Sequence, residues 1–242
     1  DDAAHPDRGA LGLRRDAVTA LKELSVPVLR WPGGCFADNY HWRQGVGSAQ
    51  HRPRTVNHTW GGMIEDNGFG THEFIQLCSL IGAKPYLAGN VGSGSPAELR
   101  DWVEYCNEPS GSTLADERIA NGAPRPFGVR YWGVGNESWA CGGHLTAEEY
   151  AALYARFATF VPACGDTPPY LIAVGPNSND TDWTRRFFTH YFGPEARDLR
   201  ELFQLLQDGA LFWYDTFERR VWHWGDIGKI HLGQETRVTL DA

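Results

Sequence analysis

The chain has 242 residues, 42% of them hydrophobic and 13% aromatic, and carries a formal net charge of −8. This length and composition suit a globular protein with one large core or two small ones. The net negative charge and scattered Lys and Arg argue against a nucleic-acid partner, which needs a basic face. No apolar run approaches the roughly 20 residues that cross a bilayer, and residues 1–6 lack a signal-peptide pattern. We therefore expect a soluble, cytoplasmic protein without a membrane partner, and a homo-oligomer is left open.

Helical periodicity appears in five stretches of the chain. The predicted helices cover residues 11–24, 71–81, a stretch from 96, a stretch from 146, and 181–191. Ser95 and Thr146 each open a capping box, which fixes the starts of the third and fourth helices. Gly82 follows the second helix and ends it.

Short apolar runs alternate with these helices. They predict strands over residues 26–32, 84–90, 129–134 and 170–174. Residues 39–70 form a long irregular region rich in His, Trp, Gly and Asn, and a loop of this length in a compact domain usually carries function. After residue 193 we predict a helix at 199–206 and strands at 210–214 and 227–232.

The alternation of strands and helices indicates an α/β fold with parallel strands. Each predicted strand ends in Gly, Asn, Cys or Glu, and clustering of such residues at the carboxyl ends of strands is typical of the (β/α)8 TIM barrel. A doubly wound sheet is the alternative. It is disfavoured because residues 133–137 do not form the Gly-x-Gly-x-x-Gly phosphate loop that many such sheets carry.

The run from Val129 to Val134 ends in Gly135, Asn136 and Glu137. We interpret it as a buried strand whose tip opens into an active site. A carboxyl group at this tip, walled by Trp132 and Trp139, would lose hydration and favour its protonated form, as a general acid requires. The alternative is that Asn136 and Glu137 cap the next element.

Arg30 is a further candidate residue of the site. Arg30 lies near the end of a predicted buried strand, where its guanidinium needs a carboxylate partner, either as a simple ion pair or to hold a catalytic carboxylate ionised.

The five cysteines are widely spaced, which predicts neither a disulfide framework nor a structural zinc site. Cys35 and Cys141 fall in glycine-rich loops after strands, where they could touch a ligand. A cysteine nucleophile is the less favoured alternative, because no nearby histidine is positioned to generate the thiolate.

Several linked motifs together resemble the α-L-arabinofuranosidases of glycoside hydrolase family 51. They occur in the family's order at residues 30–38, 60–62, 67–74, 90–94, 131–137 and 141–143. The resemblance implies a (β/α)8 barrel and a retaining glycosidase that releases terminal α-L-arabinofuranosyl residues from arabinose-containing oligosaccharides or polysaccharides. It also implies that neither a metal nor an organic cofactor is needed.

The resemblance assigns roles to particular residues. Glu137 would be the acid/base, and Asn136 would hydrogen-bond the sugar beside the reacting carbon. Arg30 would lie under the nucleophile, Cys35 would occupy a position where many relatives have a sugar-binding Asn, and Trp60 would shape the substrate pocket. The other substrate-binding candidates are Asn90 and Tyr214.

The sequence departs from the family pattern in three regions. The chain begins with a helix, so the family's first strand is not found. Residues 212–214 match the family's His-x-Tyr motif only at Tyr214. The nucleophile motif is absent, because a strict alignment puts Gly233 where the Glu belongs, although Glu235 lies two residues further on and on the same face of a strand.

We expect one domain over 1–242 with a divergent tail over 193–242, and the family's C-terminal β-sandwich is not found. The departures from the family pattern leave two main hypotheses for the function of this domain. The first is an active arabinofuranosidase with Glu235 as nucleophile. The second is an incomplete barrel that lacks the second carboxylate and acts at most as a sugar-binding module. An inverting glycosidase is a weaker third hypothesis, which would require a wider separation of its two carboxylates.

Overall fold

A computed structural model of the chain describes residues 13–165, 168–176 and 181–194. The chain divides into two compact units, residues 1–175 and 176–242. The expected single domain over 1–242 with a divergent tail over 193–242 therefore stays a prediction. The elements predicted at 199–206, 210–214 and 227–232 lie outside the described residues.

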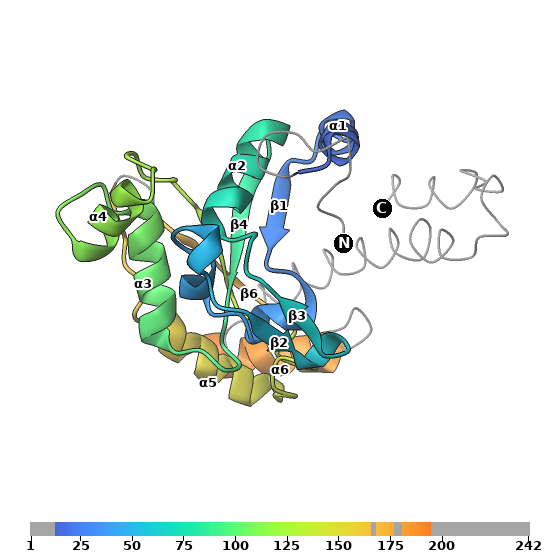
Figure 1. Cartoon of the computed structure of the whole chain (residues 1–242). Coiled ribbons are helices and arrows are strands. Elements are labelled where there is room, and N and C mark those ends of the chain that lie inside the picture. Colours follow the sequence, from blue (N-terminus) through green and yellow to red (C-terminus); the bar gives the residue numbers. More distant parts are fainter. Residues whose placement is uncertain (1–12, 166–167, 177–180, 195–242) are drawn as a thin grey trace, which may run out of the picture. The chain divides into compact units, whose positions relative to one another are not determined.

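The first unit is built on a four-stranded parallel sheet (Figure 1). Its strands, in spatial order, are β1 (Val28–Trp31), β4 (Lys84–Gly89), β5 (Tyr131–Val134) and β6 (Tyr170–Ala173). Trp31 lies opposite Leu87, and Gly89 lies opposite Val134. The carboxyl ends of the strands therefore meet at one edge of the sheet, as predicted.

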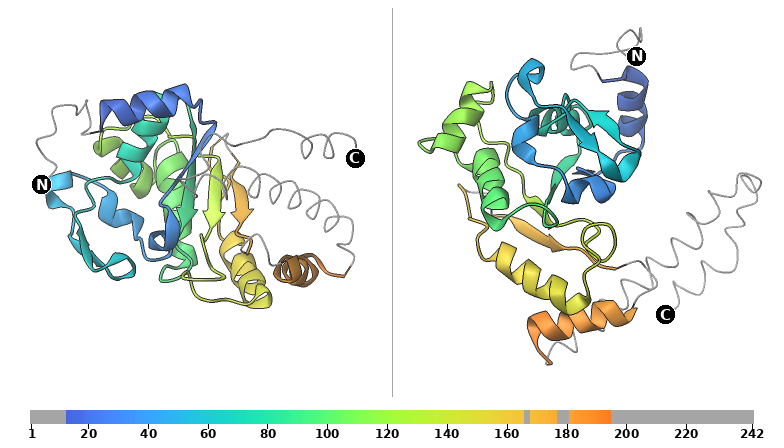
Figure 2. Two further views of the ribbon diagram at one scale, coloured as in Figure 1. Left: turned by 90° about the vertical axis from the view of Figure 1, so that its right-hand side faces the viewer. Right: turned by 60° about the horizontal axis from the view of Figure 1, so that its bottom comes forward.

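One helix precedes the sheet and four lie between its strands along the chain, and Figure 2 shows them from two further directions. They are α1 (Arg15–Glu23), α2 (Thr71–Ile81), α3 (Pro96–Asn107), α4 (Thr113–Ala120) and α5 (Ala147–Ala158). Helix α2 packs against β4, and α5 packs against β5. Helix α4 was not predicted, and it begins where the Ser112 side chain accepts a hydrogen bond from the backbone N–H of Ala115. The other four agree with the predicted helices.

The core lies between the helices and the sheet. Trp132 of β5 is fully buried, and the centroid of its ring lies 5.6 Å from that of Trp102 of α3. The predicted inner faces of the helices are buried here as well, including Phe74, Leu99 and Tyr150. Because side chains alternate along a strand, the Trp132 ring belongs to the helix side and its neighbour Gly133 to the other side.

The irregular region over 39–70 is an ordered excursion between β1 and α2. It contains η3 (Trp42–Gly45), η4 (Ala49–His51), the antiparallel pair β2 (Thr55–Asn57) and β3 (Met63–Glu65), and η5 (His58–Trp60) between them. The buried Arg52 side chain forms a 2.8 Å ion pair with Glu73 of α2. It also donates hydrogen bonds to the carbonyls of Gly47 and Asn67. This arginine thus ties the excursion to the start of α2.

The second unit contributes one described helix, α6 (Thr181–Phe192). Its aromatic side chains stack along the helix, with ring centroids 5.7 Å apart for Trp183 and Phe187 and 5.8 Å apart for Phe187 and Tyr191. None of the helices in the described parts of the chain is both long and apolar enough to span a membrane.

Candidate active site

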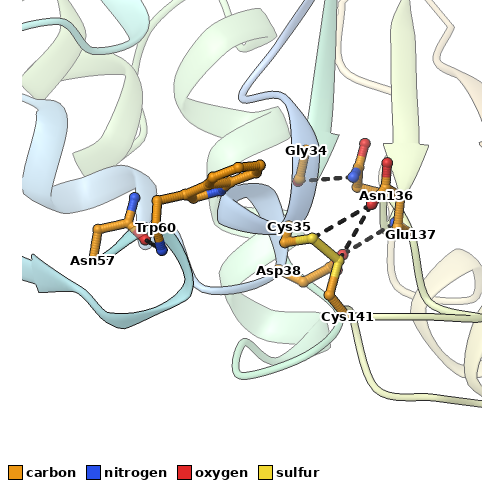
Figure 3. Close-up of a disulfide and its surroundings, with 8 residues drawn as sticks. All are labelled: Gly34, Cys35, Asp38, Asn57, Trp60, Asn136, Glu137 and Cys141. Carbon is orange, nitrogen blue, oxygen red and sulfur yellow. Dashed lines mark hydrogen bonds between the residues drawn. A yellow bond between two sulfur atoms is a disulfide. The ribbon is translucent and has the colours of Figure 1, made fainter. Parts of the chain in front are cut away.

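The candidate site is formed by two loops that leave the carboxyl ends of the sheet. The loop after β1 contains η2 (Gly34–Asp38), which carries Cys35. The loop after β5 carries Asn136, Glu137 and Cys141, and a turn in which the N–H groups of Ala140 and Gly142 donate to the carbonyl of Glu137 brings Cys141 back beside Glu137. Figure 3 shows the two loops side by side.

Asp38, at the end of η2 in the loop after β1, binds the backbone of the loop after β5. Its carboxylate accepts hydrogen bonds of 3.3 Å from the backbone N–H of Val91 and of 3.3 Å from that of Glu137. Burial raises the pKa of this carboxyl to about 6, although the N–H donors favour its charged form. A side chain at Gly142 would collide with the Asp38 carboxylate, so the close approach requires glycine there. The sequence did not single out Asp38, because a buried loop aspartate looks like an exposed one in sequence.

Cys35 and Cys141 form a disulfide across the two loops, with their Cα atoms 5.5 Å apart. This corrects the prediction that the cysteines form no disulfide framework. The Sγ atoms of Cys35 and Cys141 lie 3.4 and 3.2 Å from Oε2 of Glu137. The half-buried Glu137 carboxylate is thus bordered by sulfur, and wide spacing along the chain gave no signal for this pairing.

The predicted aromatic wall around Glu137 is wrong for Trp132. Its ring faces the helices, packs on Trp102 and donates a hydrogen bond to the carbonyl of Val129. The cause is the alternation of side chains along β5, which sends Trp132 away from the loops at the strand tip.

Asn136 is 3% exposed, and its Nδ2 donates a 2.8 Å hydrogen bond to the carbonyl of Gly34. Its Oδ1 is buried and has no hydrogen-bond partner among the described residues. A buried acceptor without a partner is uncommon in proteins, and a ligand hydroxyl would satisfy it. The side chain therefore suits the predicted contact with a sugar.

The other substrate-binding candidates differ in their surroundings. Trp60 is 58% exposed and lies beside the loop at Gly34, where it presents an aromatic face next to the site. Asn90 is buried, and its amide is occupied within its own neighbourhood. Its Nδ2 donates to the carbonyl of Tyr40 and to Ser93, and its Oδ1 accepts from the N–H groups of Ser93 and Gly94. The structure thus gives Asn90 a part in shaping the loop after β4.

Arg30 does not occupy the predicted buried position. It is exposed on β1, which lies at one edge of the four-stranded sheet, and no described carboxylate forms an ion pair with it. Glu235 and Tyr214 lie outside the described residues.

Comparisons with known proteins agree with this arrangement of strands and loops. A family model described as the alpha-L-arabinofuranosidase 1 domain matches residues 20–208. The chain is 51% identical over 173 residues to an intracellular exo-alpha-L-arabinofuranosidase of Bacteroides ovatus, a match that covers 72% of this chain and 34% of that protein. It is 43% identical over 152 residues to alpha-L-arabinofuranosidase C of Emericella nidulans, covering 62% of this chain and 30% of that one.

Solved structures give the same result. The GH51 arabinofuranosidase from Xanthomonas axonopodis pv. citri superposes with a TM-score of 0.74 at 47% identity, over 77% of this chain and 38% of that one. The alpha-L-arabinofuranosidase from Thermotoga maritima, solved as an arabinose complex, superposes with a TM-score of 0.72 at 38% identity, over 78% and 39% of the two chains.

This chain spans about a third of the length of the curated relatives it matches. Its parallel strands and crossover helices are of the (β/α)8 barrel type, and the described residues contain four strands of such a barrel. The chain belongs to the α-L-arabinofuranosidases of glycoside hydrolase family 51.

Proposed function

We propose that this chain is a retaining glycoside hydrolase that releases terminal α-L-arabinofuranosyl residues from arabinose-containing oligosaccharides or polysaccharides. The observation that carries the proposal is the pairing of Asn136 and Glu137 at the tip of β5. One side chain offers a buried acceptor for a sugar hydroxyl, and the other offers a carboxyl group next to it in sequence. Trp60 adds an exposed aromatic face beside the same loops.

In this mechanism Glu137 protonates the glycosidic oxygen while a second carboxylate attacks the anomeric carbon. Glu137 then deprotonates the water that releases the sugar, and a retaining mechanism of this kind requires the two carboxyl groups to be about 5–5.5 Å apart. We propose Glu235 as the nucleophile. Asp38 acts as a positioning residue, since its carboxylate accepts a hydrogen bond from the backbone N–H of Glu137. This bond fixes the backbone of Glu137, the proposed acid/base.

The names of the relatives support this proposal. The proteins of Bacteroides ovatus and Emericella nidulans are named as arabinofuranosidases, and the former is also named as intracellular and exo-acting. A cytoplasmic location and a place in arabinan degradation are therefore part of the proposal.

The test is hydrolysis of a chromogenic α-L-arabinofuranoside by the full chain. General acid catalysis contributes about 10²–10⁴-fold to a rate, so Glu137→Gln should lower the turnover number by about that factor. Glu149→Gln is the matched control, because Glu149 is exposed and its capping box accepts Gln as well as Glu. This control should keep the native rate.

Absence of turnover by the native chain would overturn the hydrolase proposal. Calorimetry with arabinose and arabino-oligosaccharides then decides whether a sugar-binding module remains. Asn136→Leu removes the buried acceptor and should abolish the heat of binding in that case.

A further inference from the structure

Three side chains of the site bring metal-ligand atoms together. Among the described residues, Cys35, Glu137 and Cys141 form the one group of His, Cys, Asp or Glu whose ligand atoms all lie within 4.8 Å of one another. A fourth residue, Asp38, holds the backbone of this group. Its carboxylate accepts a hydrogen bond from the N–H of Glu137 and contacts the loop at Gly142. The backbone that carries Glu137 and Cys141 is therefore held by a contact that does not involve the disulfide.

The spacing of these atoms suits a tetrahedral thiophilic cation once the sulfur atoms are free thiols. Zinc bonds of about 2.3 Å to sulfur and about 2.0–2.2 Å to oxygen place tetrahedral ligands about 3.6–3.8 Å apart. The two sulfur atoms lie 3.4 and 3.2 Å from Oε2 of Glu137, so the carboxylate needs to move by only a few tenths of an ångström. With Cα atoms 5.5 Å apart, rotation of the two cysteine side chains can open the remaining sulfur–sulfur distance.

We propose that reduction of the Cys35–Cys141 disulfide creates a binding site for one thiophilic divalent cation, Zn²⁺ or Cd²⁺, with the Glu137 carboxylate as the third ligand. A phosphine and one water convert the disulfide into two thiols and a phosphine oxide. The cation then replaces the two thiol protons, which are released to solvent. In the disulfide form both sulfur atoms are bonded to each other, and the cation does not bind.

The chemistry of the ligands selects the class of cation. Two thiolates favour soft or borderline ions over Mg²⁺ and Ca²⁺, which prefer oxygen ligands. Together with the carboxylate they also carry more negative charge than one divalent cation neutralises, which favours cation binding. Three protein ligands leave one tetrahedral position for water.

The consequence for catalysis rests on the proposed function. If Glu137 is the acid/base, the bound cation holds its carboxylate and prevents proton transfer. The site would then make hydrolysis sensitive to metal in the reduced protein only.

The experiment compares the disulfide and reduced forms of the full chain. The disulfide is reduced with tris(2-carboxyethyl)phosphine, the phosphine is removed under argon, and a thiol assay in denaturant should give two more thiols than in the disulfide form. Cd²⁺ is then added without substrate, and the ultraviolet thiolate-to-cadmium band is recorded. We expect the reduced chain to bind one more equivalent of Cd²⁺ than the disulfide form.

The disulfide form is itself the matched control, because Cys78, Cys106 and Cys164 are free thiols in it as well. Cys35→Ser should abolish the band in the reduced state, and Glu137→Gln should weaken binding by at least about tenfold, since loss of even an outer-shell partner costs this much. Circular dichroism should show the same secondary structure before and after reduction.

Equal binding by the two forms, binding that survives Cys35→Ser, or unfolding on reduction would each overturn the proposal. Because binding is measured without substrate, these results are independent of whether the chain hydrolyses arabinofuranosides. Where hydrolysis is observed, Zn²⁺ should inhibit the reduced chain, and a chelator should restore its rate.

Discussion

His72 shows how one side chain sets a pH limit on stability. Its Nε2 lies 2.7 Å from the Tyr105 hydroxyl, which also accepts a 3.1 Å hydrogen bond from Nδ2 of Asn121. The hydroxyl can give its one proton to His72 when Nε2 is unprotonated. Burial lowers the pKa of His72 below its ordinary value of 6.5.

The free energy of unfolding should therefore fall as the pH drops below about 6.5. In that range the unfolded chain takes up a proton at His72 before the folded chain does. The contribution of His72 to stability is therefore full above its pKa in the unfolded chain, and it is lost as the pH falls towards its pKa in the folded chain. The contribution of one proton cannot exceed about 1.4 kcal/mol per pH unit. Urea unfolding at several pH values should show a shallower slope for His72→Gln, which keeps an acceptor for Tyr105.

The control for this measurement is His51→Gln, a substitution at an exposed histidine in η4. Its pH slope should equal that of the native chain. A slope unchanged by His72→Gln would show that the buried ring does not account for the loss of stability in acid.

The sequence could place residues at a strand tip, whereas the roles proposed for them stay predictions. Glu137 and Asn136 could be found in this way, because the apolar run before them marks the strand. Asp38 and the Cys35–Cys141 pair could not, because their contacts join loops that are distant in sequence. The burial of Trp132 away from the site follows from the side-chain alternation, which the aromatic-wall hypothesis did not take into account.

At the scale of elements, the excursion over 39–70 depends on Arg52. The Arg52 side chain is 3% exposed and pairs with Glu73, whose side chain is 21% exposed. Removal of one member of a buried ion pair leaves the other charge without compensation, which typically costs about 3–5 kcal/mol. Arg52→Met should accordingly lower the free energy of unfolding by about 3 kcal/mol or more, measured by urea denaturation.

The control for Arg52 is Arg100→Met. Arg100 pairs with Asp101 at the surface, where the two side chains are 48% and 32% exposed. Solvent screening limits such a pair to about 1 kcal/mol or less. Similar losses for the two variants would mean that the buried pair does not anchor the excursion.

The helices were predictable because their caps and apolar faces are local signals. Ser95 and Thr146 cap α3 and α5 as expected. Helix α4 was missed because the Gly and Pro around it are typical of loops, whereas its stability depends on the burial of Leu114, Ala115 and Arg118. The order within 39–70 was hidden for a similar reason, since it rests on a tertiary ion pair.

At the scale of the whole molecule, the disulfide joins the loops after β1 and β5 across a sequence separation of 106 residues. Closing so long a loop restricts the unfolded chain, and disulfides of this kind contribute about 2–5 kcal/mol. Reduction should lower the free energy of unfolding by about that amount in guanidinium titrations. Cys35→Ser should show no further change on reduction, and a native chain equally stable in both redox states would contradict the prediction.

The order of the strands has a consequence for folding kinetics. Strand β1 pairs with β4, and β4 pairs with β5, so both partners of each pair lie tens of residues apart along the chain. Bringing such distant strands together costs loop-closure entropy before the strands make any contact. Parallel pairing of this kind is therefore slower than the formation of a local hairpin. Once the disulfide is reduced, the loops that carry Cys35 and Glu137 reach their native positions only when β4 has paired with both of their strands. In the reduced chain, proximity of those two residues therefore reports a late event in folding, and a probe on the free Cys35 thiol would follow the assembly of the site in real time.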